Sequence, residues 1–155
     1  YEAENKTGNH ILDTILTTKS LNCQEKNIQM TCVADGKALD FLNPMDICSI
    51  FGNALDNAIT SAEKMENPEK RLIHVTVSQE KSFLRIKIEN SFQGVLKMKN
   101  QLPITTKEDR LYHGFGLKSM KEIAEKYKGS LTVSAKDGWF ELRILIPLPE
   151  DEKII

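Results

Sequence analysis

Three stretches of the chain carry apolar residues at helical spacing, and two of them follow asparagines suited to cap a helix. The first follows Asn9 and runs to about Gln24. The second follows Asn43, with Pro44 at the first helical position and Asp46 in the first turn, where the helix dipole favours an anion. The residues that set the spacing are Ile11, Leu12, Ile15 and Leu16 in the first stretch, Cys48, Phe51, Leu55, Ala58 and Ala62 in the second, and Leu117, Met120, Ile123, Ala124 and Tyr127 in the third, which stops at Gly129.

Strict alternation of apolar and polar residues predicts strands between these helices. The alternating stretches are residues 28–34, 73–78, 84–89, 131–135 and 139–146. Residues 79–82 join the second and third stretches, and a turn at residues 136–138 joins the last two, so each pair is expected to form an antiparallel hairpin. Residues 150–155 are expected to form a tail.

The periodicity disappears from Asn90 to His113, where a long polar stretch contains only scattered apolar residues. A loop of this length inside a compact domain is more often functional than incidental. The resulting order of helix, strand, helix, hairpin, long loop, helix and hairpin predicts an α+β fold. We expect a two-layer α/β sandwich, in which a mixed sheet carries its helices on one face.

Length and charge narrow the class of protein. A chain of 155 residues is long enough for one domain with a core and too short for two comfortable ones. With 21 Lys and Arg against 22 Asp and Glu, the formal net charge is -1, so the chain has no basic field that would attract nucleic acid. Nucleic acid is therefore not expected as a partner.

Cysteine usage and hydropathy bear on the compartment. Cys23, Cys32 and Cys48 are odd in number and lack close pairs, so they suggest neither a disulfide framework nor a zinc site, and a reducing cytosol fits best. No run of about eighteen apolar residues and no signal segment is present. We expect the stretch to be soluble and, because it does not begin with methionine, to be a fragment of a larger protein.

Two motifs carry candidate chemistry. Asn53 and Asn57 lie four residues apart on the second predicted helix, so both carboxamides project in the same direction and can reach one metal ion or water cluster. Residues 113–117 contain two glycines before the third helix, where the backbone can approach phosphate oxygens closely. The combination indicates a nucleotide site, whereas Asp56, between the asparagines, is expected to form an ion pair or to lie on the helix surface.

These motifs occur in an order similar to that of the GHKL ATPase superfamily. The asparagine helix is followed by a strand end at Glu89, Asn90 and Ser91, a loop at residues 105–107 and the glycine turn at residues 113–117. More narrowly, the chain from about Asn9 to Pro149 resembles the ATP-binding catalytic domain of sensor histidine kinases of the peptide quorum-sensing type. The resemblance implies a Bergerat-like fold whose long loop is an ATP lid.

The resemblance also implies roles for individual residues. Asn57 would ligate Mg²⁺ and Asn53 would lie beside the same ion, as neutral oxygen donors suited to a hard cation. Lys107 would approach the phosphates when the lid closes, and His113 would line the phosphate edge. The residues implied at the nucleotide are Asn53, Asn57, Asn90, Lys107, His113, Gly114, Phe115, Gly116 and Leu117, with Asn53 and Lys107 assigned to catalysis and Leu117 anchoring the third helix in the core.

Two of these positions refine the expected reaction. Hydrolytic members of the superfamily carry a carboxylate at the position of Asn53, and a carboxamide cannot act as that base, so transfer of the γ-phosphoryl group is favoured over hydrolysis. Asn90 replaces an aspartate of the wider superfamily, as in the quorum-sensing group. Asn90 can accept a hydrogen bond from the adenine amine and donate one to a ring nitrogen, although loss of the charge should weaken binding by about 1 kcal/mol.

The implied protein is the cytoplasmic catalytic domain of a bacterial membrane sensor kinase. A phosphoacceptor is missing, because His74 lies in a strand, His113 in the phosphate loop, and His10 lacks the acidic residue that usually follows the acceptor. Residues 1–26 are therefore expected to be the end of a truncated dimerisation helix, and residues 27–149 the ATP-binding domain.

The partners implied are Mg²⁺-ATP, the acceptor helix of the same full-length homodimer and a response regulator. Two alternatives stay open, a stand-alone GHKL serine kinase and a non-catalytic nucleotide-sensing or scaffold module. Transmembrane and acceptor segments upstream would favour the sensor kinase over the stand-alone kinase.

Overall fold

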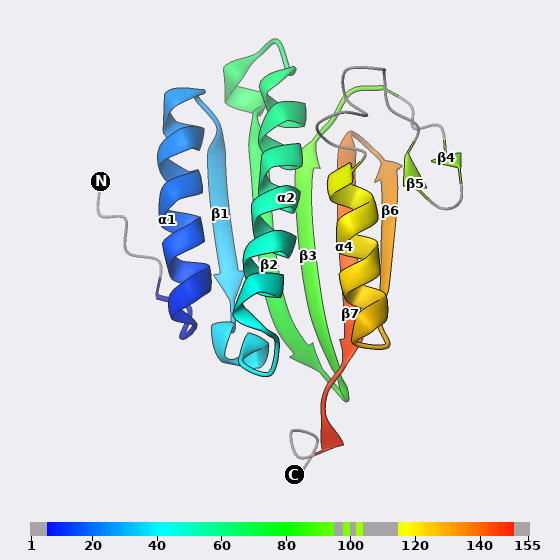
Figure 1. Ribbon diagram of the computed structural model, residues 1–155. Coiled ribbons are helices and arrows are strands. Elements are labelled where there is room, and N and C mark those ends of the chain that lie inside the picture. Colours follow the sequence, from blue (N-terminus) through cyan, green and yellow to red (C-terminus); the bar gives the residue numbers. More distant parts are fainter. Residues whose placement is uncertain (1–5, 95–97, 100–101, 104–114, 151–155) are drawn as a thin grey trace.

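One mixed sheet organises the fold in the computed structural model, which describes residues 6–94, 98–99, 102–103 and 115–150. Its five strands lie in the order β1-β2-β3-β7-β6 (Figure 1). β1 runs parallel to β2, and every other neighbouring pair is antiparallel. The strands are β1 (Gln29–Ala34), β2 (Leu72–Glu80), β3 (Phe83–Ser91), β6 (Ser130–Lys136) and β7 (Trp139–Pro147). Both predicted hairpins, β2 with β3 and β6 with β7, are confirmed.

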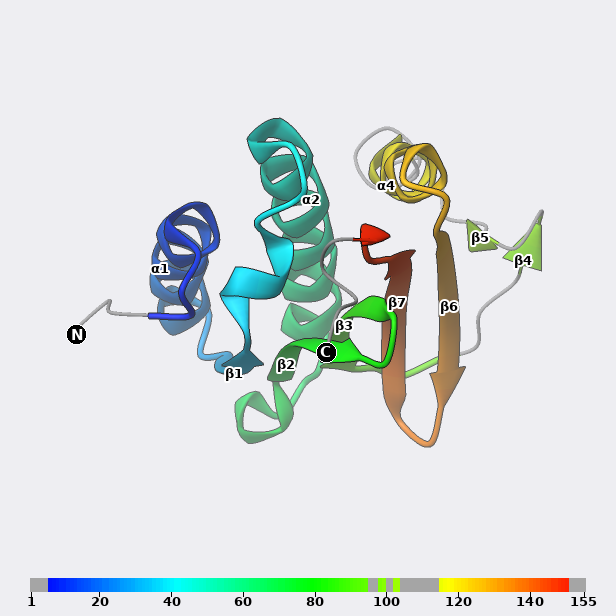
Figure 2. The same ribbon diagram turned by 90° about the horizontal axis from the view of Figure 1, so that it is seen from below.

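The helices α1 (His10–Glu25), α2 (Pro44–Glu63) and α4 (Phe115–Lys126) cover one face of the sheet (Figure 2). Two short 3₁₀ helices, η1 (Gly36–Leu39) and η2 (Pro68–Lys70), lie in the connections. This arrangement confirms the predicted two-layer α/β sandwich. None of the helices in the described part of the chain has the length and hydropathy needed to cross a membrane.

The predicted helix caps are present. Asn9 Oδ1 accepts a hydrogen bond from the backbone N–H of Leu12 at 3.0 Å, and α1 begins at His10. Asn43 Oδ1 accepts one from the backbone N–H of Met45 at 2.8 Å, and Pro44 is the first residue of α2. Each cap satisfies an N–H group that has no partner within the helix, which explains why the helices begin at these residues.

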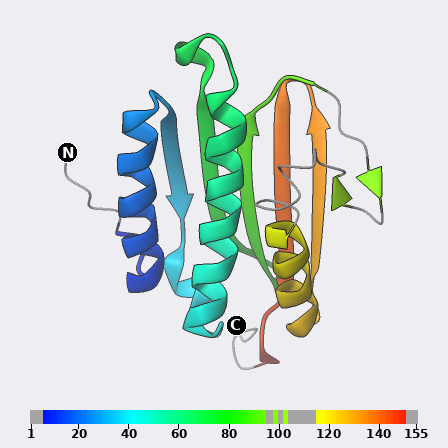
Figure 3. The same ribbon diagram turned by 45° about the horizontal axis from the view of Figure 1, so that its top comes forward.

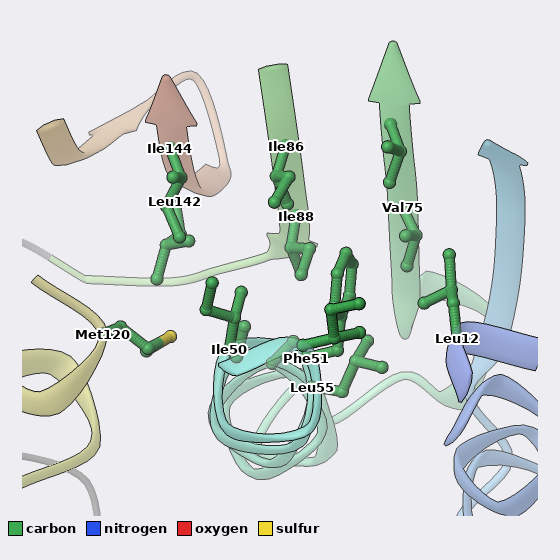
Figure 4. Packing of buried hydrophobic residues seen from close by; sticks show 14 of the residues in the cluster. Leu12, Ile50, Phe51, Leu55, Val75, Ile86, Ile88, Met120, Leu142 and Ile144 are labelled. Atoms are coloured by element: carbon green, nitrogen blue, oxygen red, sulfur yellow. The ribbon is translucent and has the colours of Figure 1, made fainter. Parts of the chain in front are cut away.

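The core lies between the sheet and the helices, with α2 at its centre (Figure 4). Phe51 and Leu55 of α2 are fully buried, and they face inward residues of the strands such as Val75 and Ile86. Because side chains alternate across a strand, the odd-numbered apolar residues of β2 and the even-numbered ones of β3 and β7 face the helices. The polar residues between them lie on the sheet face that no described helix covers.

Helix α1 belongs to the same core. Leu12, Leu16 and Cys23 are buried in one cluster with the residues of α2 and the sheet. The role predicted for residues 1–26, the end of a dimerisation helix, stays a prediction; in this structure the apolar face of α1 packs within the domain.

Two sequence predictions differ from the structure. The helical spacing predicts that Cys48 belongs to the buried stripe of α2, but Cys48 is exposed, because this end of the helix turns Ile47 and Ile50 inward instead. The long loop contains a short antiparallel pair, β4 (Met98–Lys99) with β5 (Leu102–Pro103), that was not predicted. Strands of two residues have too few positions to show a period.

Candidate nucleotide site

A stripe of polar side chains runs along α2. Ser49, Asn53, Asn57 and Ser61 follow one another at intervals of four residues, and all four are half-buried. Each interval turns the side-chain direction by only about 40° on an α-helix, so the stripe keeps to one side of α2. Figure 3 shows α2 between α1 and α4, and the contacts below place the stripe on the α4 side.

One end of the stripe contacts the first turn of α4. Gly116 is buried, and a Cβ atom at this residue would lie 3.2 Å from Asn53 Oδ1 and 3.4 Å from its Cβ and Cγ. The absence of a side chain at Gly116 therefore lets the beginning of α4 approach Asn53. Backbone N–H groups at a helix N-terminus have no partners within the helix, so this end of the stripe suits an anion such as phosphate.

Asn53 is oriented by its own helix. Its Nδ2 donates to the backbone oxygen of Ser49 at 2.8 Å and to Ser49 Oγ at 3.3 Å. The amide nitrogen is thus held by the preceding turn, and the amide oxygen faces Gly116. An oxygen held in this way can accept a hydrogen bond or bind a hard cation, but it cannot remove a proton from water.

The other end of the stripe meets a buried asparagine of the sheet. Asn90 lies in β3 between Ile73 of β2 and Phe140 of β7 and is only 1% exposed. Its Nδ2 donates to Ser61 Oγ at 2.9 Å and to the backbone oxygen of Ser91 at 2.8 Å. Both amide hydrogens are engaged, so the predicted donation to an adenine ring nitrogen would require one of these bonds to break. The amide oxygen is the atom suited to accept from an amine.

The two contacts of the stripe, at Asn53 and at Ser61, are separated by a distance suited to one nucleotide. Asn53 and Ser61 are eight residues apart on α2, which corresponds to about 12 Å along the helix. Asn57 lies midway between them. A ligand lying along this stripe could contact the buried amide of Asn90 with one part and the beginning of α4 with another.

A cavity of about 430 Å³ adjoins the stripe on its outer side, within the size range of small-molecule sites. A larger depression of about 570 Å³ around residues 27–29 and 68–69 lies apart from the stripe. The cavity of about 430 Å³ lies on the α1 side of the asparagines, so we assign the candidate site from the stripe and its contacts with Gly116 and Asn90. The cavity is lined by Asn22 of α1, by Lys26 directly after α1, and by Asn53, Asp56, Asn57, Ile59 and Thr60 of α2.

The remaining predicted residues are placed as follows. Asp56 turns toward α1 and pairs with Lys19, with 2.5 Å between Nζ and Oδ1, which confirms the predicted ion pair. Leu117 is buried in the core, as predicted for the residue that anchors α4. Lys107, His113 and Gly114 lie outside the described residues, as does the side chain of Phe115.

The two described histidines lie away from the stripe. His10 is exposed at the start of α1. His74 lies on the sheet face opposite the helices, where its ring stacks on Trp139 with centroids 4.9 Å apart and its Nδ1 is 3.7 Å from Glu89 Oε1. Neither histidine is close to the groups that could bind a nucleotide.

Ser61 and Ser49 were not predicted as site residues. Both continue the four-residue spacing of the two asparagines, so the spacing could have pointed to them. The partners of Ser61 and Asn90 could not be read in the same way, because their hydrogen bond joins residues 29 positions apart.

Replacement of Gly116 by alanine is expected to weaken binding at the Asn53 end. The new Cβ would lie 3.2 Å from Asn53 Oδ1, so the asparagine must move by a few tenths of an ångström. We expect ATP affinity to fall about five-fold with little change in thermal stability, since the higher helix propensity of alanine offsets the local clash of one methyl group. Calorimetric titration with ATP measures the effect. Gly52→Ala is the matched control, because a Cβ there would meet nothing within 4 Å. Equal affinities of the two variants would contradict the assignment.

Comparison with known proteins finds a matching family model and a curated relative. A family model described as "GHKL domain" matches residues 42–147. A curated protein of Halalkalibacterium halodurans, "Probable C4-dicarboxylate sensor kinase", is 23% identical over 137 residues, which cover 84% of this chain and 26% of that protein. The chain thus spans about a quarter of the length of the curated relative that it matches.

Solved structures share the fold. The catalytic domain of histidine kinase ThkA superposes with a TM-score of 0.66 at 20% identity, over 90% of this chain and 93% of that one. The histidine kinase AdeS of Acinetobacter baumannii gives a TM-score of 0.63 at 16% identity, over 90% of this chain and 64% of that one. At these identities, the superpositions show that the architecture is shared.

Proposed function

Because the chain belongs to the GHKL domain family, we propose that it is the ATP-binding catalytic domain of a sensor histidine kinase. It would bind Mg²⁺-ATP and transfer the γ-phosphoryl group to a histidine outside these residues. The observation that carries the proposal is the polar stripe of α2, which runs from the glycine of α4 at Asn53 to the buried Asn90 at Ser61. The sensor-kinase relative and the catalytic-domain structures support the same proposed function.

The residues present fit such a ligand. The first turn of α4 approaches Asn53 at a residue without a side chain, which leaves room near backbone N–H groups suited to phosphate. Asn53 and Asn57 offer neutral amide oxygens, which suit a Mg²⁺ ion whose charge is balanced mainly by phosphates. The oxygen of Asn90 suits an exocyclic amine, since its nitrogen is already engaged. When bound, Mg²⁺-ATP would supply the phosphoryl group and the cation that offsets its charge.

The residues of the protein would bind and orient the nucleotide, and they would offer no base to activate water. Ser49 fixes the amide of Asn53, and Ser61 fixes that of Asn90, so both oxygens are held in place before a ligand arrives. No carboxylate replaces Asn53 on the stripe, and the nearby Asp56 is paired with Lys19. A site without a base for water favours transfer to another acceptor over hydrolysis. Lys107, His113 and Gly114 complete the proposed phosphate contacts.

The whole protein is proposed to be a membrane-anchored bacterial homodimer that passes the phosphoryl group to a response regulator. The peptide quorum-sensing subtype also stays a prediction, because the curated relative is described as a C4-dicarboxylate sensor kinase.

Autophosphorylation of the full-length protein tests the proposal. With ATP labelled at the γ-phosphate, we expect an acid-labile label on the full-length protein and almost none on this chain alone. His10→Gln is the control, because His10 is exposed at the start of α1 and is not the proposed acceptor. Label lost in that variant would place the acceptor within this chain. An acid-stable label on a serine would favour the stand-alone kinase, and bound ATP without any label would favour a scaffold.

A further inference from the structure

A second polar cluster joins the C-terminal end of α4 to the first turn of α2. The hydroxyl of Tyr127, the residue after α4, donates to Asp46 Oδ2 at 2.5 Å and accepts from the backbone N–H of Asn43 at 2.9 Å. Lys126 Nζ lies 2.7 Å from the same Asp46 oxygen. Asp46 is only 8% exposed. The end of α4 is therefore tied to the cap and first turn of α2 by charge-assisted bonds.

The protonation states favour these bonds at neutral pH. Burial alone would raise the pKa of Asp46, but the hydrogen bonds from Lys126 and Tyr127 outweigh it and hold that pKa below its usual value. Burial, together with the bond to Asp46, raises the pKa of Tyr127, so the hydroxyl remains a donor. The carboxylate, ammonium and phenol are each in the form that the cluster requires.

The cluster and the contact of Gly116 with Asn53 lie at opposite ends of α4. α2 and α4 run antiparallel (Figures 1 and 3), and Gly116 meets Asn53 while Tyr127 meets Asn43. From Gly116 to Tyr127 is eleven residues, and from Asn43 to Asn53 is ten, so the two contacts are separated by about 16 Å on α4 and about 15 Å on α2. A shift of α4 along α2 at one end must therefore appear at the other.

Among the interactions of the described residues, apolar packing holds α4 between the two contacts. Leu117, Met120 and Ala124 are 4%, 0% and 0% exposed. Apolar contacts are non-directional and tolerate small slides, whereas hydrogen bonds fix distance and angle. The hydrogen bonds of the polar cluster therefore fix the position of α4 along α2.

We propose that Tyr127 and Asp46 are positioning residues that set the placement of Gly116 against Asn53, and thereby the phosphate end of the site. The nucleotide part of this inference rests on the proposed function. The coupling between the two ends does not, because it concerns the free protein.

Nuclear magnetic resonance of the free protein tests the coupling. Tyr127→Phe removes the hydroxyl but keeps the ring that packs edge-on against Phe41 with centroids 6.2 Å apart, and Asp46→Asn removes the charge. In both variants we expect the Asn53 side-chain amide and the Gly116 backbone amide to shift. Glu63→Gln, which removes the exposed ion pair of α2 with Lys26, is the control and should leave both signals in place. Unchanged Asn53 and Gly116 signals in both variants would overturn the inference.

Nucleotide affinity separates positioning from a general loss of structure. ATP binding should weaken about five-fold in Tyr127→Phe and in Asp46→Asn, within the range for mutations that act through a packed element. Adenosine binding should not change, since Asn90 and Ser61 lie at the other end of the stripe. Equal losses for ATP and adenosine would overturn the inference.

If Tyr127→Phe does not fold, Asp46→Asn decides alone. If the unmodified chain binds no nucleotide, the proposed function fails, and the resonance shifts still decide the coupling.

Discussion

The Asn57→Ala variant is expected to lose most of its Mg²⁺-dependent ATP binding while keeping its fold. Asn57 lies midway between Asn53 and Ser61 on the polar stripe and is half-buried, so its amide oxygen is the ligand that we propose for the metal. Losing a polar contact to a charged group costs about 2 kcal/mol, equivalent to roughly 30-fold in affinity. Calorimetric titration with ATP, in Mg²⁺ and in a chelator, measures the difference.

The control for this experiment is Glu63→Gln, on the same helix but on the side that faces α1. It should bind ATP as the unmodified chain does. Thermal unfolding should be nearly unchanged in Asn57→Ala, because none of the described hydrogen bonds depends on this side chain. An Asn57→Ala chain with unchanged affinity and unchanged dependence on Mg²⁺ would show that the metal is not held here.

Asn90→Ala is expected to lower both stability and nucleotide affinity. Asn90 is 1% exposed, and its removal leaves Ser61 Oγ and the backbone oxygen of Ser91 without their donor. We expect a loss of about 2 kcal/mol in the free energy of unfolding, typical for buried polar groups left unsatisfied. Unfolding by denaturant measures this loss in the free energy of unfolding.

Binding by the same variant distinguishes the two ends of the site. Asn90→Ala should weaken adenosine and ATP to a similar extent, whereas Asn57→Ala should weaken ATP and spare adenosine. Each variant thus serves as the control for the other. An Asn90→Ala chain that is destabilised but binds adenosine normally would restrict Asn90 to a structural role.

The fold was largely predictable because its signals are local. The caps at Asn9 and Asn43 and the alternating strands each depend on residues within a few positions of one another, and the structure confirms them. Cys48 shows where local reasoning fails. Its spacing fits a buried stripe, but the direction in which α2 faces its neighbours is decided by tertiary packing.

The site was predictable in its separate parts, and the structure adds how they are connected. The spacing of Asn53 and Asn57 indicates one helix face, and the glycine turn indicates close approach of backbone. The contact of Gly116 with Asn53 and the bond of Asn90 to Ser61 both join residues far apart in the chain. The link from Asp46 to Tyr127, 81 positions apart, is of the same kind, since Asp46 was expected only to complement the helix dipole.

The lack of a carboxylate on the stripe favours phosphoryl transfer over hydrolysis in the proposed reaction. Asn53 donates to Ser49 through its nitrogen and offers only an oxygen to the site, and Asp56 is held by Lys19. A bound triphosphate would therefore meet no base able to activate water among these residues. This arrangement suits a domain that holds ATP until an acceptor is presented by another part of the protein.

The most direct test follows the side-chain amides of Asn53, Asn57 and Asn90 by nuclear magnetic resonance during titration with ATP, in Mg²⁺ and in a chelator. We predict that the Asn90 signals shift with ATP under both conditions and that the Asn57 signals shift only when Mg²⁺ is present. Shifts confined to other surfaces, such as the sheet face around His74 and Trp139, or no shifts at all, would contradict the assignment of the α2 stripe as a Mg²⁺-ATP site.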